Sequence, residues 1–210
     1  YFFKTFKNQK LFKSLISADL AIPDGAGLLL ALKLKGMSLK KSVPGIELSE
    51  KALQYCAENG ISVAFLGSQK DSLEAMVQNK KQQYPSLKVA YARDGYFDES
   101  EMDSIAEDLK KTNPGLLLVA LGIPKQEIWI QKYKSLLKNT VLIGVGGSFD
   151  VWAGKVKRAP LIFRKLHSEW VFRLLQEPSR YKRIFYALPY FVIQIITKQK
   201  KFEIHVNQVC

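Results

Sequence analysis

Short apolar runs alternate along the 210-residue chain with longer segments in which apolar side chains recur every three or four positions. The runs predict strands and the longer segments predict amphipathic helices, with glycine, proline or asparagine at most of the boundaries. The predicted strands span residues 18–22, 61–66, 87–92, 116–121 and 140–145. The predicted helices between them span residues 26–35, 46–58, 71–84, 100–111 and 126–137.

This alternation predicts an α/β fold, with a Rossmann-like parallel sheet core and helices on both faces. The runs 116–121 and 140–145 are apolar enough to indicate strands buried within the sheet. After Asp150 the pattern changes to helices only, over about 161–176 and 179–197, with a kink at Pro189. We therefore expect residues 1–155 to form the core and residues 156–210 to form a C-terminal helical appendage.

The composition excludes several classes of protein. Hydrophobic residues make up 47% and charged residues 24% of the chain, which is typical of a folded domain and not of a disordered one. No run approaches the roughly 18 apolar residues of a transmembrane helix. The two cysteines, Cys56 and Cys210, lie far apart and there are two histidines, so neither a disulfide scaffold nor a Cys/His zinc site is expected.

Positive charge is concentrated near the end of the chain. The formal net charge is +13, and residues 151–201 hold twelve Lys and Arg against two acidic residues, so this stretch carries +10 of the total. Arg173, Arg180 and Arg183 lie within a few turns of one another and are interleaved with aromatic residues. Such a segment favours binding to a phosphate-bearing partner, and three classes fit: a nucleic acid, an anionic lipid and a phosphorylated ligand.

Glycine and polar residues follow each predicted strand. Ligands of open parallel sheets bind beyond the carboxyl ends of the strands, where glycine permits close backbone approach and helix N-termini offer N–H groups to phosphate. Five such loops converging on one edge predict a cleft for a nucleotide or a sugar nucleotide. The loops begin at Pro23, Gly67, Asp94, Gly122 and Gly144.

Each of these signals also has a purely structural explanation. The glycines of 144–147 do not complete a GxGxxG motif and also suit a tight turn between strand and helix. Asp24 also suits a helix N-cap, and Lys125 with Glu127 also suits a solvated first turn. The arginine cluster also suits a solvated helix face. No DxD sequence occurs, so a metal clamp on a diphosphate has no obvious ligand.

Taken together, strings spread over nearly the whole chain resemble the WecG/TagA/CpsF glycosyltransferases, glycosyltransferase family twenty-six. The most specific are Ala-Leu-Gly-Ile-Pro-Lys-Gln-Glu-Ile-Trp-Ile at 120–130, Gly-Val-Gly-Gly-Ser-Phe-Asp at 144–150 and Glu-Trp-Val-Phe-Arg-Leu-Leu-Gln-Glu-Pro-Ser-Arg at 169–180. Shorter matches occur at 21–27, 43–48, 65–67, 95–97 and 153–160, and all of them follow the family's order.

The resemblance implies an inverting, metal-independent transferase that needs no cofactor. Its donor would be a UDP-sugar, N-acetylmannosamine or a relative, and its acceptor a sugar linked to undecaprenyl diphosphate. The product would enter bacterial teichoic acid, common antigen or capsule synthesis. On this basis residues 1–155 would be the catalytic core, acting peripherally at the cytoplasmic face of the cell membrane.

The resemblance also assigns roles to individual residues. Asp24 falls on the proposed catalytic base, which would deprotonate the acceptor hydroxyl as it attacks the anomeric carbon. Gln126 falls on a polar residue important to activity, is assigned to the catalytic residues together with Asp24, and is expected to contact the sugar. Arg173, Arg180 and Arg183 match arginines thought to reach the diphosphate, which a guanidinium binds in a bidentate manner. The remaining expected substrate-binding residues are Gly25, Gly67, Gly95, Lys125, Gly144, Gly146, Gly147 and Asp150.

The appendage is expected to have two jobs. In the family it is thought to close the active site, and its removal favours oligomers with an open, inactive site, so a homo-oligomer is an expected inactive state. Its basic and aromatic residues also suit an anionic membrane surface, where a lipid-linked acceptor presents its diphosphate.

Three departures from the family leave alternatives open. An upstream Thr/Asn segment that lines the site is expected before Tyr1, Ser42 stands where arginine is frequent, and His167-Ser168 replaces Gly-Leu. The first two favour, as an alternative, a non-catalytic paralogue that binds UDP-sugar or the lipid carrier. A nucleic-acid binder is a third hypothesis that rests on charge alone, because no recognisable motif supports it, and we expect no nucleic-acid partner.

Overall fold

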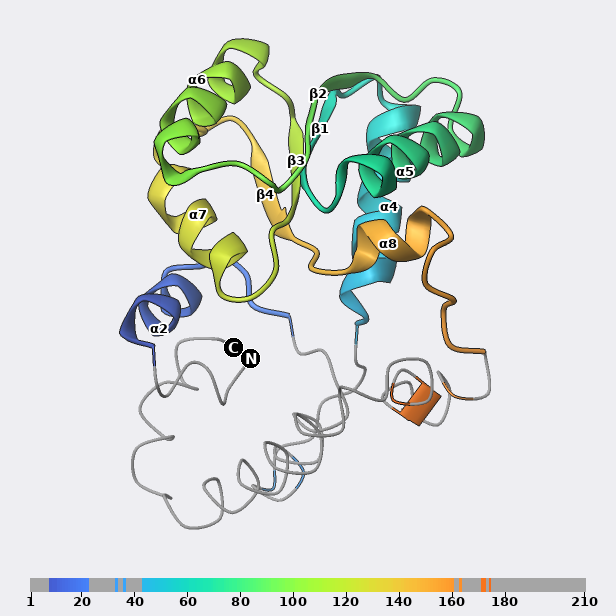
Figure 1. Cartoon of the computed structure of the whole chain (residues 1–210), viewed down its shortest axis with the longest axis horizontal. Helices are drawn as coiled ribbons and strands as arrows, with labels where there is room; N and C mark the ends of the chain where they lie inside the picture. The colour runs from blue at the N-terminus through green and yellow to red at the C-terminus, as the bar shows by residue number, and fades with distance from the viewer. Residues whose placement is uncertain are drawn as a thin grey trace. The chain divides into compact units, whose positions relative to one another are not determined.

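The computed structural model describes residues 8–22, 33, 36, 43–160, 163, 171, 172 and 174 (Figure 1). The chain divides into two compact units. The first consists of Asn8–Ala18 and Gly45–Lys157, and it contains every strand of the described residues. The second consists of Tyr1–Lys7, Asp19–Pro44 and Arg158–Cys210, and within it the rings of Phe163 and Phe172 lie 5.6 Å apart.

In the first unit, strands and helices alternate in the order expected from the sequence. The elements are α2 (Gln9–Ile16), α4 (Gly45–Glu58), β1 (Val63–Gly67), α5 (Lys70–Gln83), β2 (Val89–Arg93), η1 (Glu99–Glu101), α6 (Met102–Thr112), β3 (Leu116–Ala120), α7 (Lys125–Tyr133), β4 (Val141–Gly144) and α8 (Ser148–Trp152). All strand pairs are parallel, and the sheet order is β2-β1-β3-β4. The predicted α/β fold with a parallel sheet is therefore confirmed.

Helices cover both faces of the sheet, as predicted (Figure 1). On one face α4, α5 and α8 pack on alternate strand residues such as Phe65 and Leu118. On the other face α6 and α7 pack on the intervening residues, such as Leu66 and Leu117. Strands β1 and β3 are buried along their whole length because both helical layers cover them, which explains why their sequences are continuous apolar runs.

Two strand predictions are wrong in the described residues. Residues 18–22 form no strand, and Leu20 is 76% exposed, so this short apolar run is not part of the sheet. The run 140–145 does contain β4, but that strand is not buried, because it lies at the edge of the described sheet and Val141 is 61% exposed. The predicted helices over 26–35, 161–176 and 179–197 lie outside the described residues or are described there at isolated positions.

Helix α2 has no counterpart among the predicted elements. Asn8 caps its N-terminus, since Asn8 Oδ1 accepts hydrogen bonds from the backbone N–H groups of Lys10 at 3.0 Å and Leu11 at 3.1 Å. The helix contacts α7, and Lys134 Nζ donates to the carbonyl oxygen of Ser17 just after its end at 2.6 Å. No helix in the described part of the chain has the length and apolar character that crossing a membrane requires.

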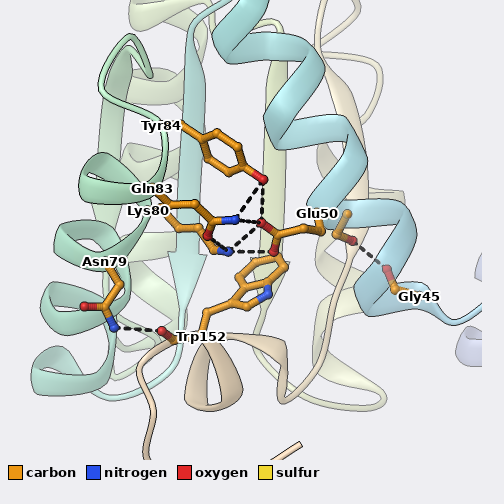
Figure 2. Close-up of polar contacts among 8 residues, drawn as sticks. Gly45, Glu50, Asn79, Lys80, Gln83, Tyr84 and Trp152 are labelled. Atoms are coloured by element: carbon orange, nitrogen blue, oxygen red, sulfur yellow. Dashed lines mark hydrogen bonds and ion pairs between the residues drawn. The ribbon is translucent and has the colours of Figure 1, made fainter. Parts of the chain in front are cut away.

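A polar cluster around the buried Lys80 joins α4 and α5 beside α8 (Figure 2). Lys80 is 4% exposed, and its Nζ donates to both carboxylate oxygens of Glu50, at 2.7 and 2.6 Å. Gln83 and Tyr84 also donate to Glu50, at 3.0 and 2.8 Å. Burial, and secondly the bond to Glu50, raise the pKa of Tyr84 to about 12.

The same cluster holds α8 through Trp152. Lys80 Nζ lies 4.7 Å from the centre of the Trp152 ring, within the range of a cation–π interaction. Asn79 Nδ2 donates to the carbonyl oxygen of Trp152 at 2.9 Å. Because α8 has only five residues, its stability comes from such tertiary contacts and not from its own hydrogen bonds. We call Glu50, Lys80, Gln83, Tyr84 and Trp152 the α8 brace.

We expect Lys80→Met to lower the free energy of unfolding by about 3 kcal/mol, because it leaves the largely buried Glu50 carboxylate without its cation. Urea unfolding followed by tryptophan fluorescence measures the change. The matched control is Lys110→Met, since Lys110 pairs with Glu107 at 3.5 Å with both side chains about half exposed. This control is expected to change stability by less than about 0.5 kcal/mol. Equal effects of the two substitutions would contradict a stabilising role of the brace.

Candidate active site

The order of the strands places a topological switch point between β1 and β3. The chain passes from β1 to β2 on one side of the sheet and then returns to β3 on the other side of β1. The loops that follow β1 and β3 therefore diverge to opposite faces, which leaves a crevice at the carboxyl ends of these strands. This is the position at which open α/β sheets bind ligands.

A cleft of about 910 Å³ occupies this position. The loops after the four strands of the described sheet line it, whereas the fifth expected loop, which begins at Pro23, lies outside the described residues. Ser68, Gln69 and Ser72 come from the segment after β1; Gly95, Tyr96, Phe97, Asp98 and Glu101 follow β2; Ala120, Leu121, Gly122 and Lys125 follow or end β3; Gly146, Gly147, Asp150, Lys155 and Val156 follow β4.

The floor of the cleft requires backbone contact between neighbouring strands. Gly67 pairs with Ala120 in the β1–β3 register and has a φ of 126°. A Cβ atom on Gly67 would lie 2.4 Å from the carbonyl carbon of Ala120, a distance that no side chain tolerates. Gly95 also packs closely here, because a Cβ atom on it would lie 3.1 Å from the Gly67 Cα. Gly67 therefore lies beneath the cleft and shapes it without lining it.

Ser68 and Asp150, which both line the cleft, join the loop after β1 to α8. Ser68 Oγ donates a hydrogen bond of 2.9 Å to Asp150 Oδ1. The backbone of Ser68 is also fixed, since its N–H donates to the Ala120 oxygen at 3.1 Å and its oxygen accepts from the Gly95 N–H at 2.8 Å. Ser68 has a φ of 63°, a left-handed conformation that costs a non-glycine residue about 1 kcal/mol.

Gln126 lies under the loop that follows β4. Its side chain is buried, at 1% exposure, and its Oε1 accepts a hydrogen bond of 3.0 Å from the backbone N–H of Gly146. Its Nε2 donates to Glu127 Oε1 at 2.7 Å. Gly144 packs flat against this amide, because a Cβ atom on Gly144 would lie 2.8 Å from Gln126 Nε2. The structure thus shows Gln126 supporting the glycine loop, and contact with a sugar stays a prediction.

Charges of both signs surround the cleft. Lys125 and Lys155 are exposed at its rim. Lys155 Nζ forms an ion pair with the Asp71 carboxylate, and this bond holds the pKa of Asp71 below its usual value. On the other side of the cleft, Arg93 donates to Glu101 at 2.8 Å. Among the described residues no three His, Cys, Asp or Glu side chains lie together in a way that could hold a metal ion.

Tyr96 also lines the cleft, although no role was predicted for it. Its side chain is 72% exposed, and Gln69 Nε2 lies at 3.5 Å from its hydroxyl. The Tyr96 N–H donates to Asp94 Oδ1 at 2.9 Å, which fixes the turn that presents the ring. A large exposed aromatic ring at a ligand cleft offers a surface on which a planar base can stack. The sequence feature that could have identified Tyr96 is its place between Gly95 and Phe97, in a string that resembles the family.

The structure brings five of the expected substrate-binding residues to the cleft: Gly95, Lys125, Gly146, Gly147 and Asp150. It places three others, Gly67, Gly144 and Gln126, directly beneath the loops that form the cleft. Asp24, Gly25, Arg173, Arg180 and Arg183 lie outside the described residues. Ser68, Gln69 and Lys155 line the cleft although no role was predicted for them.

Comparison with known proteins gives this geometry a family. The model of the glycosyl transferase WecG/TagA/CpsF family matches residues 1–204. The chain is 33% identical over 198 residues to the N-acetylglucosaminyldiphosphoundecaprenol N-acetyl-beta-D-mannosaminyltransferase of Bacillus spizizenii, which covers 94% of this chain and 76% of the relative. A protein of the same name from Staphylococcus aureus is 35% identical over 186 residues, covering 89% of this chain and 72% of the relative.

The family match extends across the segments that build the cleft, including the loops after β3 and β4, whose sequences carry the resemblance. A parallel α/β sheet is also the fold that the alternation of apolar runs and helical patterns predicted. This chain belongs to the WecG/TagA/CpsF family of glycosyl transferases and is a glycosyltransferase.

Proposed function

We propose that this enzyme transfers N-acetylmannosamine, or a close relative, from a UDP-sugar to N-acetylglucosamine linked to undecaprenyl diphosphate. The donor binds in the cleft at the carboxyl ends of β1 and β3, and the product enters bacterial cell-surface polymer synthesis. The observation that carries this proposal is a cleft of about 910 Å³ at the switch point, in a chain that is 33% identical to an N-acetylmannosaminyltransferase over 94% of its length.

The cleft offers the groups that a sugar nucleotide needs. The Asp150 carboxylate accepts hydrogen bonds from ligand hydroxyl or N–H groups, and the Tyr96 ring offers a stacking surface for the base. Gly146 and Gly147 precede α8 and border open space, since a Cβ atom on either would meet nothing within 4 Å. This open backbone suits close approach by the ligand.

The proposed reaction is a single displacement. The Asp24 carboxylate accepts the proton of the acceptor hydroxyl while the oxygen attacks the anomeric carbon of the donor sugar. The bond from that carbon to the diphosphate oxygen breaks, and UDP leaves with the bonding electron pair. Transfer from an α-linked donor to the β-linked product named for the relatives inverts the anomeric carbon. Arg173, Arg180 and Arg183 stabilise the departing diphosphate in place of a metal ion.

We expect turnover to depend on Asp24. With UDP-N-acetylmannosamine and N-acetylglucosaminyl diphosphate on a short lipid, Asp24→Asn should lower kcat about 100-fold or more, because the amide cannot take the proton. UDP release measures the rate, and UDP binding should be unchanged.

The matched control is Asp19→Asn, which removes an exposed carboxylate five positions earlier and should keep full activity. A wild-type chain that binds UDP but releases none from any donor would favour the non-catalytic binding paralogue. Equal rates for the two variants would instead remove Asp24 from the mechanism.

We expect catalysis to continue without divalent metal. The rate in excess EDTA should stay within about twofold of the untreated rate, because arginine side chains and not a metal ion stabilise the leaving diphosphate. Loss of activity in EDTA that Mg²⁺ or Mn²⁺ restores would show that a metal takes part.

We also propose that the enzyme works peripherally at the cytoplasmic face of the cell membrane, where residues 156–210 contact anionic lipid and close the active site. The basic composition of 151–201 supports this proposal, since each Lys or Arg near an anionic surface contributes about 1 kcal/mol of attraction.

With a water-soluble acceptor, vesicles that contain phosphatidylglycerol should therefore increase the rate several-fold. Vesicles of phosphatidylcholine alone should not do so, and about 0.5 M salt should remove the increase, because the attraction is electrostatic. Full activity in buffer that anionic vesicles leave unchanged would contradict membrane-coupled activation.

A further inference from the structure

Ser68 has a backbone conformation that its side-chain type does not favour. Within the described residues, Ser68 and Asn113 are the non-glycine residues with positive φ, at 63° and 44°. Asn113 has a structural reason, because it is the left-handed C-cap of α6 and asparagine tolerates that region well. Glycine would adopt the Ser68 conformation freely, so the serine hydroxyl needs a separate explanation.

The hydroxyl of Ser68 points at the Asp150 carboxylate, and the backbone of Ser68 is held in place by hydrogen bonds. The Ser68 backbone is hydrogen-bonded to Ala120 on one side and Gly95 on the other, so its Cβ cannot move without disturbing three strand ends. From there Ser68 Oγ donates to Asp150 Oδ1 at 2.9 Å, although the two residues are 82 positions apart in the sequence.

We propose that Ser68 is a positioning residue for the donor, which holds the Asp150 carboxylate in its ligand-binding orientation. An aspartate side chain rotates about two bonds, and a ligand that must stop this rotation loses affinity. Ser68 holds Oδ1, while Asn79 and the α8 brace hold α8, so Asp150 keeps Oδ2 for the ligand. This inference rests on the proposal that a UDP-sugar occupies the cleft.

Ser68→Gly is a sharp test because it separates binding from folding. Glycine suits a φ of 63°, so relief of backbone strain offsets part of the stability lost with the hydrogen bond, and the melting temperature should stay within a few degrees of that of the wild type. Loss of the hydrogen bond to a charged group should weaken UDP binding about tenfold in isothermal titration calorimetry. In an Asp150→Ala background the same substitution should cause no further loss, because the carboxylate that Ser68 orients has been removed.

Asn113→Gly is the matched control. It removes the other left-handed side chain, at the end of α6 and not at the carboxyl edge of the sheet. Its melting temperature should respond as that of Ser68→Gly does, while UDP affinity should stay within twofold of the wild type. Ser68→Gly that binds UDP as tightly as the wild type would overturn the proposal.

A second measurement does not depend on UDP. Three-bond couplings of Asp150 in the ligand-free protein should report one χ1 rotamer in the wild type and averaged rotamers in Ser68→Gly. If the wild type fails to bind UDP, the proposed donor is wrong, and these couplings still decide the role of Ser68. A single unchanged rotamer in Ser68→Gly would then overturn the positioning role.

Discussion

The cleft depends on backbone contact between the carboxyl ends of β1 and β3. Gly67 faces Ala120 in the register, and a single added carbon on Gly67 would lie 2.4 Å from the neighbouring carbonyl. This contact allows Ser68 to bond to both Ala120 and the Gly95 loop. A side chain at Gly67 would separate the strand ends, and the loops that line the cleft would lose their common floor.

Buried polar groups then fix the loops above this floor. Gln126 holds the Gly146 N–H from beneath, and the α8 brace fixes the short helix that carries Asp150. Phe149 completes the support, because it is fully buried and lies 5.8 Å from the Phe65 ring in an edge-on contact. Such buried polar groups contribute little net stability compared with apolar packing, but they restrict the loops to one arrangement. A preorganised cleft needs that restriction more than it needs additional stability.

The sequence predicts strands that are buried along their whole length, but it does not predict contacts between residues far apart in the chain. Strands β1 and β3 could be predicted because covering by two helical layers makes them continuously apolar. The run 18–22 is also apolar apart from Asp19, yet Leu20 is exposed, because an apolar run does not specify which surface covers it. The glycine loops were predicted from residue type. The Ser68–Asp150 bond could not be predicted, since it joins positions 82 residues apart and depends on the register of β1 with β3.

The charges of the cleft bear on the role proposed for the basic residues 156–210. In the sheet-containing unit, Lys125 and Lys155 at the cleft face Asp98, Glu101 and Asp150, and Lys155 is already paired with Asp71. This balance gives no excess of positive charge to stabilise a departing UDP, whose diphosphate gains charge as the bond to the sugar breaks. Residues 156–210, which do not include Lys155, hold eleven Lys and Arg against three Glu, and this charge of +8 is large enough to supply it. Because field strength at a diphosphate falls steeply with distance in water, that charge acts only when it is brought to the ligand. The charge balance therefore supports the proposal that closure of residues 156–210 over the donor, and not donor binding in the cleft alone, makes the enzyme competent for transfer.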